Sequence, residues 1–244
     1  MQFNPTNYEF AWRVVWQYRD WLWTGTQLTI KIATISMVLA MVFALPLCLL
    51  RMSRIRLLSG AALVYIALMR AIPLYVFILW MYFGVPTVLG INIVDIAAGI
   101  LCLTFQYSAW LAEIYRAALQ AIDKGQREAA LSTGLSSPRA FARVTWPQAW
   151  RIIIPPLASN YIGIIKDSSL VGVIGVNELI RQTQIADSLS FRPFELFTAA
   201  MVIYMVLALI IAPLSTLVER RAARSLSLQP RRPTRADSPI GAAA

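Results

Sequence analysis

Histidine is absent from this sequence of 244 residues, and only two cysteines, Cys48 and Cys102, are present. The absence of histidine removes the commonest metal ligand and the side chain that most often transfers protons near neutral pH. Each cysteine lies inside an apolar run, which indicates a packed thiol and no disulfide framework. No Gly-x-x-x-x-Gly-Lys-Ser/Thr segment occurs. We therefore expect a chain that is not an enzyme, does not hydrolyse ATP and holds no cofactor or metal of its own.

Charged residues are scarce as well, at 14% of the sequence, and the 12 acidic residues are outnumbered by 22 Lys and Arg. Hydrophobic residues make up 58%, and the mean hydropathy is +0.62. This composition is too apolar for a soluble domain and predicts one all-α membrane protein. A net charge of +10 would also suit a nucleic-acid-binding protein. The basic residues instead gather at the ends of apolar runs, so we expect contact with membrane lipid and no nucleic acid.

Five apolar runs approach or exceed the roughly 20 helical residues that cross a bilayer. The predicted transmembrane helices cover residues 22–50, 60–83, 96–119, 152–174 and 194–218, within one membrane domain of residues 22–221. The aromatic-rich segment 1–21 is expected at the outer membrane–water boundary. The polar segment 175–193 is expected to contain a short external helix. The basic, Pro-rich segment 222–244 is expected to be a disordered cytosolic tail.

Lys and Arg are distributed unevenly between the two sides that these spans define. The side of the loop 120–150 carries most of them, among them Arg51, Arg54, Arg56, Lys124, Arg127, Arg139, Arg143 and Arg151, whereas the other side carries Arg13, Arg19, Arg181 and Arg192. Because basic residues are retained in the cytosol, this bias predicts that the N-terminus lies outside and the C-terminus in the cytosol.

The longest polar run between apolar segments is GQREAALSTGLSSPRAFARVTWP, residues 125–147. Its first part is rich in good helix formers, and Gly134 can adopt the left-handed conformation that ends a helix. Ser137 is expected to cap a second short helix, which Pro147 would end or kink. Such a hairpin is either an ordinary amphipathic loop or a docking surface for a soluble partner, and composition alone does not separate the two.

The residues of this loop carry a resemblance. Glu128, Ala129 and Ala130, followed by Gly134 and then Pro147, resemble the EAA loop of permease subunits of bacterial binding-protein-dependent ABC importers. In that family the loop forms a coupling helix that docks into a cleft on a cytosolic ATPase. The family usually ends the loop with Ile-x-Leu-Pro, where this sequence has Val-Thr-Trp-Pro. Both apolar places stay apolar, so the expected docking surface is kept.

Ionisable side chains inside predicted spans are costly at membrane depth and often mark functional positions. Arg70 can hold a carboxylate through two parallel hydrogen bonds, and Pro73 beside it favours a kink. Asp167 can accept hydrogen bonds from an ammonium group, and Ser168 and Ser169 can add neutral contacts. We therefore predict that Arg70, Asp167, Ser168 and Ser169 bind substrate. The alternative for Arg70 is a structural ion pair with Glu113 or Asp167.

Three other charges within the spans are given no binding role. Glu113 stands three residues before Arg116, so an intrahelical ion pair is expected. Lys166 is expected to be mainly structural, and Lys31 is assigned no function.

The segments around these charges extend the resemblance over residues 25–221. Arg70-Ala-Ile-Pro-Leu, Ala112-Glu-Ile-Tyr-Arg and Lys166-Asp-Ser-Ser-Leu are similar to the polar amino acid branch of the family, which often has Thr where Ser168 stands. The resemblance implies the type I ABC importer permease fold with five core transmembrane helices, in the bacterial cytoplasmic (inner) membrane. It also implies a second permease subunit, identical or similar, two ATPase subunits that bind ATP and Mg, and an external solute-binding protein.

The function that follows is import of a polar amino acid by alternating access, driven by ATP on the partner subunits. An ion-driven secondary amino acid transporter is the alternative, and an intramembrane enzyme is disfavoured by the missing histidines. The sequence leaves open which amino acid is carried and whether the two permease subunits are identical.

Overall fold

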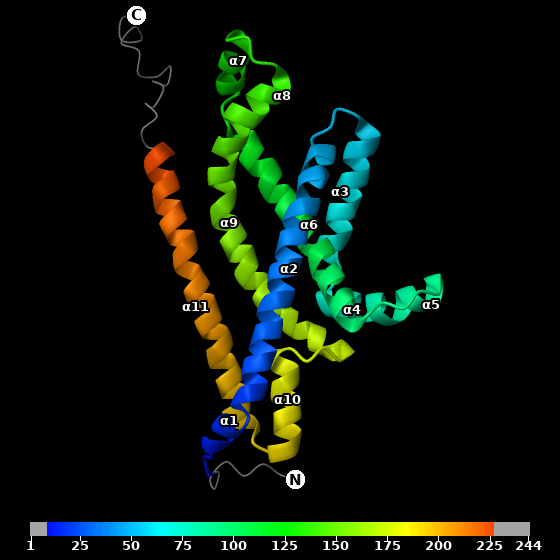
Figure 1. Ribbon diagram of the computed structural model, residues 1–244. Helices are drawn as coiled ribbons and strands as arrows, with labels where there is room; N and C mark the ends of the chain where they lie inside the picture. The colour runs from blue at the N-terminus through cyan, green and yellow to red at the C-terminus, as the bar shows by residue number, and fades with distance from the viewer. Residues whose placement is uncertain (1–8, 227–244) are drawn as a thin grey trace, which may run out of the picture.

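The computed structural model describes residues 9–226, with side chains as far as residue 212, and contains no strand within those bounds. A short helix α1 (Arg13–Gln17) leads into α2 (Arg19–Arg51), which lies beside α6 (Asp95–Ala121) through much of its length (Figure 1). The helix α9 (Trp146–Asp167) packs against α6, and α11 (Pro193–Leu226) packs against α9. The expectation of an all-α protein is confirmed for this part of the chain.

Small side chains allow α2 and α6 to approach closely. Ala33, Ala40 and Ala44 recur on one face of α2, and all three are fully buried. Small residues let helix backbones come near each other in a membrane, where packing replaces the hydrophobic effect as the main attraction. Cys48 and Cys102 are free and buried in the same core, as expected of packing thiols.

The second predicted span is bent. Helix α3 (Arg56–Ala71) ends before Pro73, and α4 (Leu74–Leu79), a π-helical turn (Trp80–Gly84) and α5 (Val85–Leu89) continue at an angle of 104°. The residue before a proline is disfavoured in the helical region, and Ile72 is accordingly extended. Gln106 Nε2 donates a hydrogen bond of 3.0 Å to the Ile72 carbonyl at the break. The kink expected at Pro73 is thus confirmed, but residues 60–83 do not form one straight helix.

Three of the described helices are long and apolar enough to cross a membrane: α2, α6 and residues 193–212 of α11. The bent pair of α3 with α4–α5 raises this to four if it is counted as one span. The fourth predicted span corresponds to α9, which is not among these helices and carries Arg151, Lys166, Asp167 and three prolines. Length and composition therefore support fewer than five independent spans, and the count of five remains a prediction.

Several expected boundaries differ from those in the structure. Helix α9 ends at Asp167, and a 3-10 helix, η4 (Ser168–Ile174), follows it. The short helix expected within 175–193 is present as α10 (Leu179–Ser190). The tail predicted to be disordered from residue 222 is helical as far as Leu226, because α11 continues to that point. Residues 1–8 and 227–244, which hold the rest of the two predicted terminal segments, lie outside the described part.

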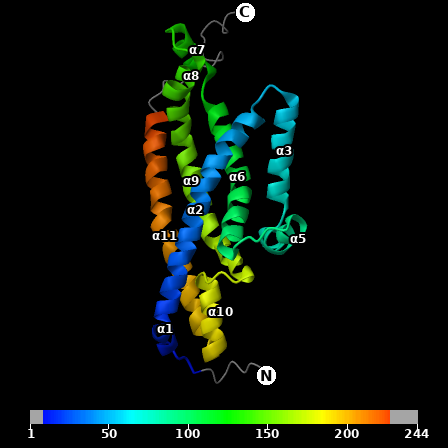
Figure 2. The ribbon, with the colours of Figure 1, turned by 45° about the vertical axis from the view of Figure 1, so that its right-hand side comes forward.

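The two polar regions lie at opposite ends of the helices. Helices α7 (Lys124–Ser132) and α8 (Ser137–Ala140), from the loop 120–150, occupy one end, while α1 and α10 occupy the other (Figures 1 and 2). The helices α2, α6, α9 and α11 fill the length between them.

Helix α10 begins at a buried carboxylate. Glu178 is 0% exposed and accepts hydrogen bonds from the backbone N–H groups of Ile180 (2.9 Å) and Arg181 (2.7 Å). The Tyr204 hydroxyl of α11 also donates to it, at 3.1 Å. Burial raises the pKa of the Glu178 carboxyl from 4.5 to about 7, even though these hydrogen bonds oppose the shift.

This carboxyl predicts that thermal stability falls as the pH rises from about 4.5 to about 7. Over that interval the unfolded chain has lost the Glu178 proton while the folded chain still holds it, so raising the pH favours unfolding. Thermal unfolding of the purified protein in detergent, recorded across this interval, measures the effect. The Glu178→Gln variant should lack this component of the pH dependence, and an unchanged profile in that variant would assign the dependence to another group.

Candidate functional site

Helices α7 and α8 form the hairpin that the sequence predicts. Asp123 caps α7, since its Oδ1 accepts a hydrogen bond of 2.7 Å from the Gly125 N–H. Gly134 follows α7 with φ of +85°, so the expected left-handed residue is confirmed. Arg127 Nη2 donates to Ser137 Oγ at 2.9 Å and ties the two helices together. The hairpin is therefore a defined structure held by side chains at its start and across its turn.

Two details of the predicted hairpin are wrong. The residue that precedes α8 is Ser136, with Ser137 already helical, and the Ser136 side chain makes no capping hydrogen bond. Pro147 does not end a helix, because it lies in the first turn of α9, directly after a π-helical turn (Phe141–Thr145). A proline inside a continuous helix removes one backbone hydrogen bond, and the π-helical turn directly before Pro147 marks an irregularity in the helix at this point. The chain thus remains helical from Ser137 to Asp167.

The exposed surface of the hairpin carries the residues of the EAA pattern. Glu128 and Ala129 are exposed, and Ala130 is buried against the rest of the hairpin. Glu128 makes no ion pair with any residue that the structure describes. Pro147 is exposed as well. The Glu128 carboxylate and the small Ala129 side chain therefore lie on a surface that no described residue covers.

Arg70 lies in the last turn of α3, just before the bend at Pro73. Its guanidinium carbon is 4.2 Å from the centroid of the Trp110 ring of α6, which is cation–π geometry. It forms no ion pair with Glu113, Asp167 or any other described residue. The alternative expectation of a structural ion pair is therefore wrong within the described residues, and the guanidinium hydrogen-bonding groups stay available.

Glu113 is engaged as expected. Arg116 Nη2 lies 2.6 Å from Glu113 Oε2, and Arg116 Nε donates to the same oxygen at 2.8 Å. Arg51 Nε of α2 lies 3.9 Å from Glu113 Oε1. The intrahelical pair is confirmed, and Glu113 has a structural role that the sequence indicated.

Asp167 lines a cavity of about 390 Å³ between α4, α6 and α9. Tyr107 Oη donates a hydrogen bond of 2.8 Å to Asp167 Oδ2. A Cβ at Gly163 would lie 2.7 Å from that hydroxyl, so glycine leaves the room that Tyr107 needs. The other residues that line the cavity are Leu74, Gln106, Trp110 and Asn160.

Trp110 connects the two main candidates. Its side chain lines the Asp167 cavity and also lies beneath the Arg70 guanidinium. A cation on α3 therefore contacts Trp110, and a carboxylate on α9 lines a cavity with Trp110, although Arg70 itself is not among the residues that line this cavity. The sequence singled out the two charges but missed Tyr107, Trp110 and Asn160. Asn160 stands seven residues, or about two helical turns, before Asp167, a same-face spacing that was available as a signal.

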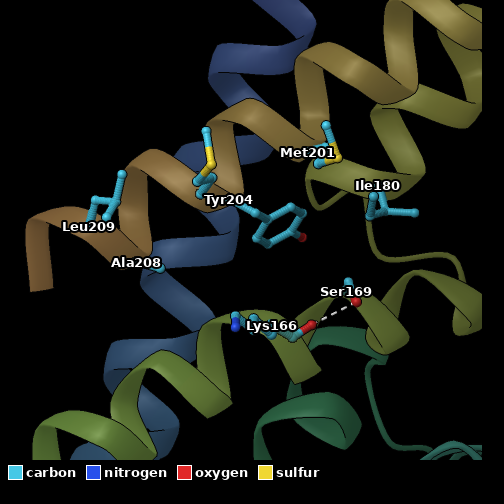
Figure 3. A pocket seen from close by; sticks show the side chains of 8 residues that line it. Lys166, Ser169, Ile180, Met201, Tyr204, Ala208 and Leu209 are labelled. Atoms are coloured by element: carbon cyan, nitrogen blue, oxygen red, sulfur yellow. Dashed lines mark hydrogen bonds between the residues drawn. The ribbon is translucent and has the colours of Figure 1, made fainter. Parts of the chain in front are cut away.

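The two serines lie apart from this cavity. Ser168 is buried, and its hydroxyl donates to the Ile165 carbonyl at 2.8 Å. Ser169 donates to the Lys166 carbonyl at 2.7 Å, and Ser169 and Lys166, but not Ser168, line a second cavity of about 480 Å³. Figure 3 shows this second cavity between the end of α9 and α11, with Tyr204 pointing into it. The structure thus does not bring the four predicted ligands into one cavity.

Comparison with known proteins gives consistent relatives. Residues 24–224 match the family described as binding-protein-dependent transport system inner membrane component. The chain is 38% identical over 190 residues, 76% of this chain and 87% of the relative, to a probable glutamine ABC transporter permease protein of Bacillus subtilis (strain 168). It is 32% identical over 216 residues, 84% and 88% of the two chains, to a glutamate/aspartate import permease protein of Escherichia coli (strain K12).

Solved structures agree with this relationship. A crystal structure of an amino acid ABC transporter with histidines superposes with a TM-score of 0.81 at 34% identity, covering 88% of this chain and 100% of that one. An inward-facing methionine ABC transporter superposes with a TM-score of 0.69 at 21% identity, covering 87% and 99% of the two chains, which shows a shared fold. The chain belongs to the family of binding-protein-dependent transport system inner membrane components, and its helical fold is that of ABC importer permeases.

Proposed function

We propose that this chain is the membrane-spanning permease subunit of an ATP-driven importer of polar amino acids in the bacterial cytoplasmic membrane. The observation that carries the proposal is the cavity lined by Trp110 and Asp167, together with the Arg70 guanidinium that lies over the same Trp110 ring. Every amino acid carries a carboxylate and an ammonium group, so a site with one cation and one anion fits the class. The relatives named as glutamine and glutamate/aspartate permeases support the same class.

In this proposal Arg70 binds the α-carboxylate and Asp167 binds the α-ammonium. The planar guanidinium can form two parallel hydrogen bonds to a carboxylate. The Trp110 ring covers one face of the guanidinium plane, and the N–H groups at its edge stay available. Tyr107 orients the Asp167 carboxylate and leaves its other oxygen free to accept from an ammonium group. Ser168 and Ser169 already donate to backbone carbonyls, so they would contribute as acceptors only.

Movement is supplied by partners. Two ATPase subunits bind ATP and Mg and dock on the hairpin surface around Glu128, Ala129, Ala130, Gly134 and Pro147. A second permease subunit, identical or similar, completes the path, with five spans in each. The loaded solute-binding protein docks at the opposite end, near α10, which this proposal places outside the cell with the N-terminus, while the C-terminus is cytosolic. Closure of the ATPases shifts the equilibrium between inward-open and outward-open states.

The experiment is purification with the co-purifying subunits, followed by uptake of an amino acid panel into vesicles. ATP-dependent accumulation of one or more polar amino acids, only in the presence of a binding protein, is the expected result. Accumulation driven by a proton gradient, with no ATPase in the purified assembly, would replace the proposal by an ion-driven secondary transporter.

A further inference from the structure

An apolar groove of about 560 Å³ separates α2 from α11. Residues four positions apart line each wall: Leu22, Thr26 and Ile30 on α2, and Val202, Val206 and Ile210 on α11. Such spacing keeps the side chains on one helix face, so each wall is a straight stripe. The Thr26 hydroxyl donates to the Leu22 carbonyl at 2.7 Å, which satisfies its donor within α2. The body of the groove is therefore complementary to an apolar occupant.

One end of the groove is aromatic and positively charged. Trp16, Arg19 and Trp23 line it there, and the Trp16 and Trp23 side chains are largely exposed. The Arg19 guanidinium carbon lies 5.9 Å from the centroid of the Trp16 ring. Among the described residues its one ion pair joins Nε to Asp20 Oδ1 at 3.5 Å, with both side chains more than half exposed. Exposed pairs of this kind contribute little, so the terminal nitrogens of Arg19 are available to another anion.

The length of the groove matches one leaflet of a membrane. Arg19 and Ile30 are about 16 Å apart along the α2 axis at 1.5 Å per residue. The hydrocarbon core of a bilayer is about 30 Å thick, so this distance is close to half of it. Tryptophan and arginine side chains gather at the membrane–water boundary, where headgroups lie. The polar end of the groove is thus at headgroup level, and its apolar part reaches toward the bilayer centre.

We propose that the α2–α11 groove binds an anionic phospholipid from the leaflet at the α1 and α10 end. One acyl chain fills the space between the two stripes. The phosphate accepts hydrogen bonds from the terminal nitrogens of Arg19, and the indole N–H groups of Trp16 and Trp23 lie where the glycerol and headgroup oxygens would be. A single acyl chain matches a groove that is apolar along its length and charged at one end only. The lipid fills the space between α11 and α2 that the protein leaves open.

The test uses the whole transporter in nanodiscs of phosphatidylglycerol or of phosphatidylcholine, followed by native mass spectrometry of the lipids that stay bound. Arg19→Gln removes the phosphate contact, and Val206→Phe fills the groove. Arg19→Gln is expected to reduce bound phosphatidylglycerol about fivefold, the upper range for one exposed charged contact. Val206→Phe is expected to reduce it at least as much, because the ring occupies the space of the acyl chain. Arg13→Gln and Met205→Phe are the matched controls, since Arg13 does not line the groove and Met205 lines the Lys166 cavity on another face of α11.

Retention of phosphatidylglycerol over phosphatidylcholine in the unchanged protein and in both controls, with loss in both test variants, supports the site. Equal retention in all five proteins overturns it. The Ile30→Cys variant gives an independent measurement by cross-linking in the intact assembly. A cross-link from this cysteine to a partner subunit would show that protein covers the groove, and would overturn the lipid site. Transport is not a readout here, so failure of the lipid site leaves the proposed import function to its own test.

Discussion

Replacing Arg70 with alanine is expected to lower amino acid uptake about 100-fold while leaving assembly intact. The loss follows because the substrate carboxylate would enter a partly desolvated cavity without its cation, and leaving one partner of such a pair alone costs several kcal/mol. The Arg70 side chain is exposed and pairs with no described carboxylate, so the fold does not depend on its charge. Uptake into vesicles, with assembly checked by size-exclusion chromatography, measures the effect.

Two further variants sharpen this test. Arg70→Lys keeps the charge but loses the planar fork, so we expect an intermediate loss, about tenfold. Arg56→Ala removes another exposed arginine from the first turn of the same helix and should transport normally. Normal uptake by Arg70→Ala would remove Arg70 from the site, whereas an equal loss in Arg56→Ala would point to a general charge effect on α3.

Apolar run length predicted two of the long helices, α2 and α6, well. The ends of α2 and α6 lie within three residues of the expected ones, because a membrane helix must stay apolar until it leaves the hydrocarbon core. Pro73 predicted a break for local reasons, since proline lacks an N–H and restricts the residue before it. The size of the bend, 104°, depends on contacts such as that of Gln106 with the Ile72 carbonyl. Such long-range contacts have no local sequence signal.

The candidate site was predictable only in its charges. Arg70 and Asp167 stand out because an ionisable side chain is costly to place inside a membrane and therefore usually has a function. Trp110 and Tyr107 do not, since aromatic residues are common in membrane helices. The prediction for Ser168 and Ser169 relied on adjacency to Asp167. Successive helical residues point about 100° apart, and the chain changes to a 3-10 helix at Ser168. Ser168 is therefore buried, while Ser169 lines a different cavity from Asp167.

The structure also connects the hairpin to the candidate site. From Ser137 onward the chain is helical through Pro147 and along α9 to Asp167. The 22 residues of α9 span about 33 Å, so a tilt of the hairpin would reach Asp167 through one continuous helix. Opposite it, Arg70 is on α3, a separate element. A rotation of α9 relative to α3 would therefore change the separation of the two proposed ligands, which is what alternating access requires of a binding site.

Replacing Gly134 with valine is expected to uncouple ATP hydrolysis from transport. Gly134 has φ of +85°, and a β-branched residue is strongly disfavoured there, at a cost above the roughly 1–2 kcal/mol of an ordinary residue. A Cβ at this position would meet nothing within 4 Å, so the effect would come from the backbone and not from a clash. Relief of the strain turns α7 relative to α8 and misaligns the surface that the ATPase contacts. We expect ATPase activity that no longer responds to the loaded binding protein, and uptake at least about tenfold lower.

Gly90 provides the matched control. It has φ of +66°, a Cβ there would also meet nothing within 4 Å, and it ends α5, away from the hairpin (Figure 1). Gly90→Val imposes a comparable backbone strain without touching α7 or α8, so hydrolysis should stay linked to uptake. If both variants lose coupling, the cause is general destabilisation. If Gly134→Val transports and hydrolyses like the unchanged protein, the hairpin does not transmit the force, because a turn that tolerates such strain cannot set the position of a docked ATPase.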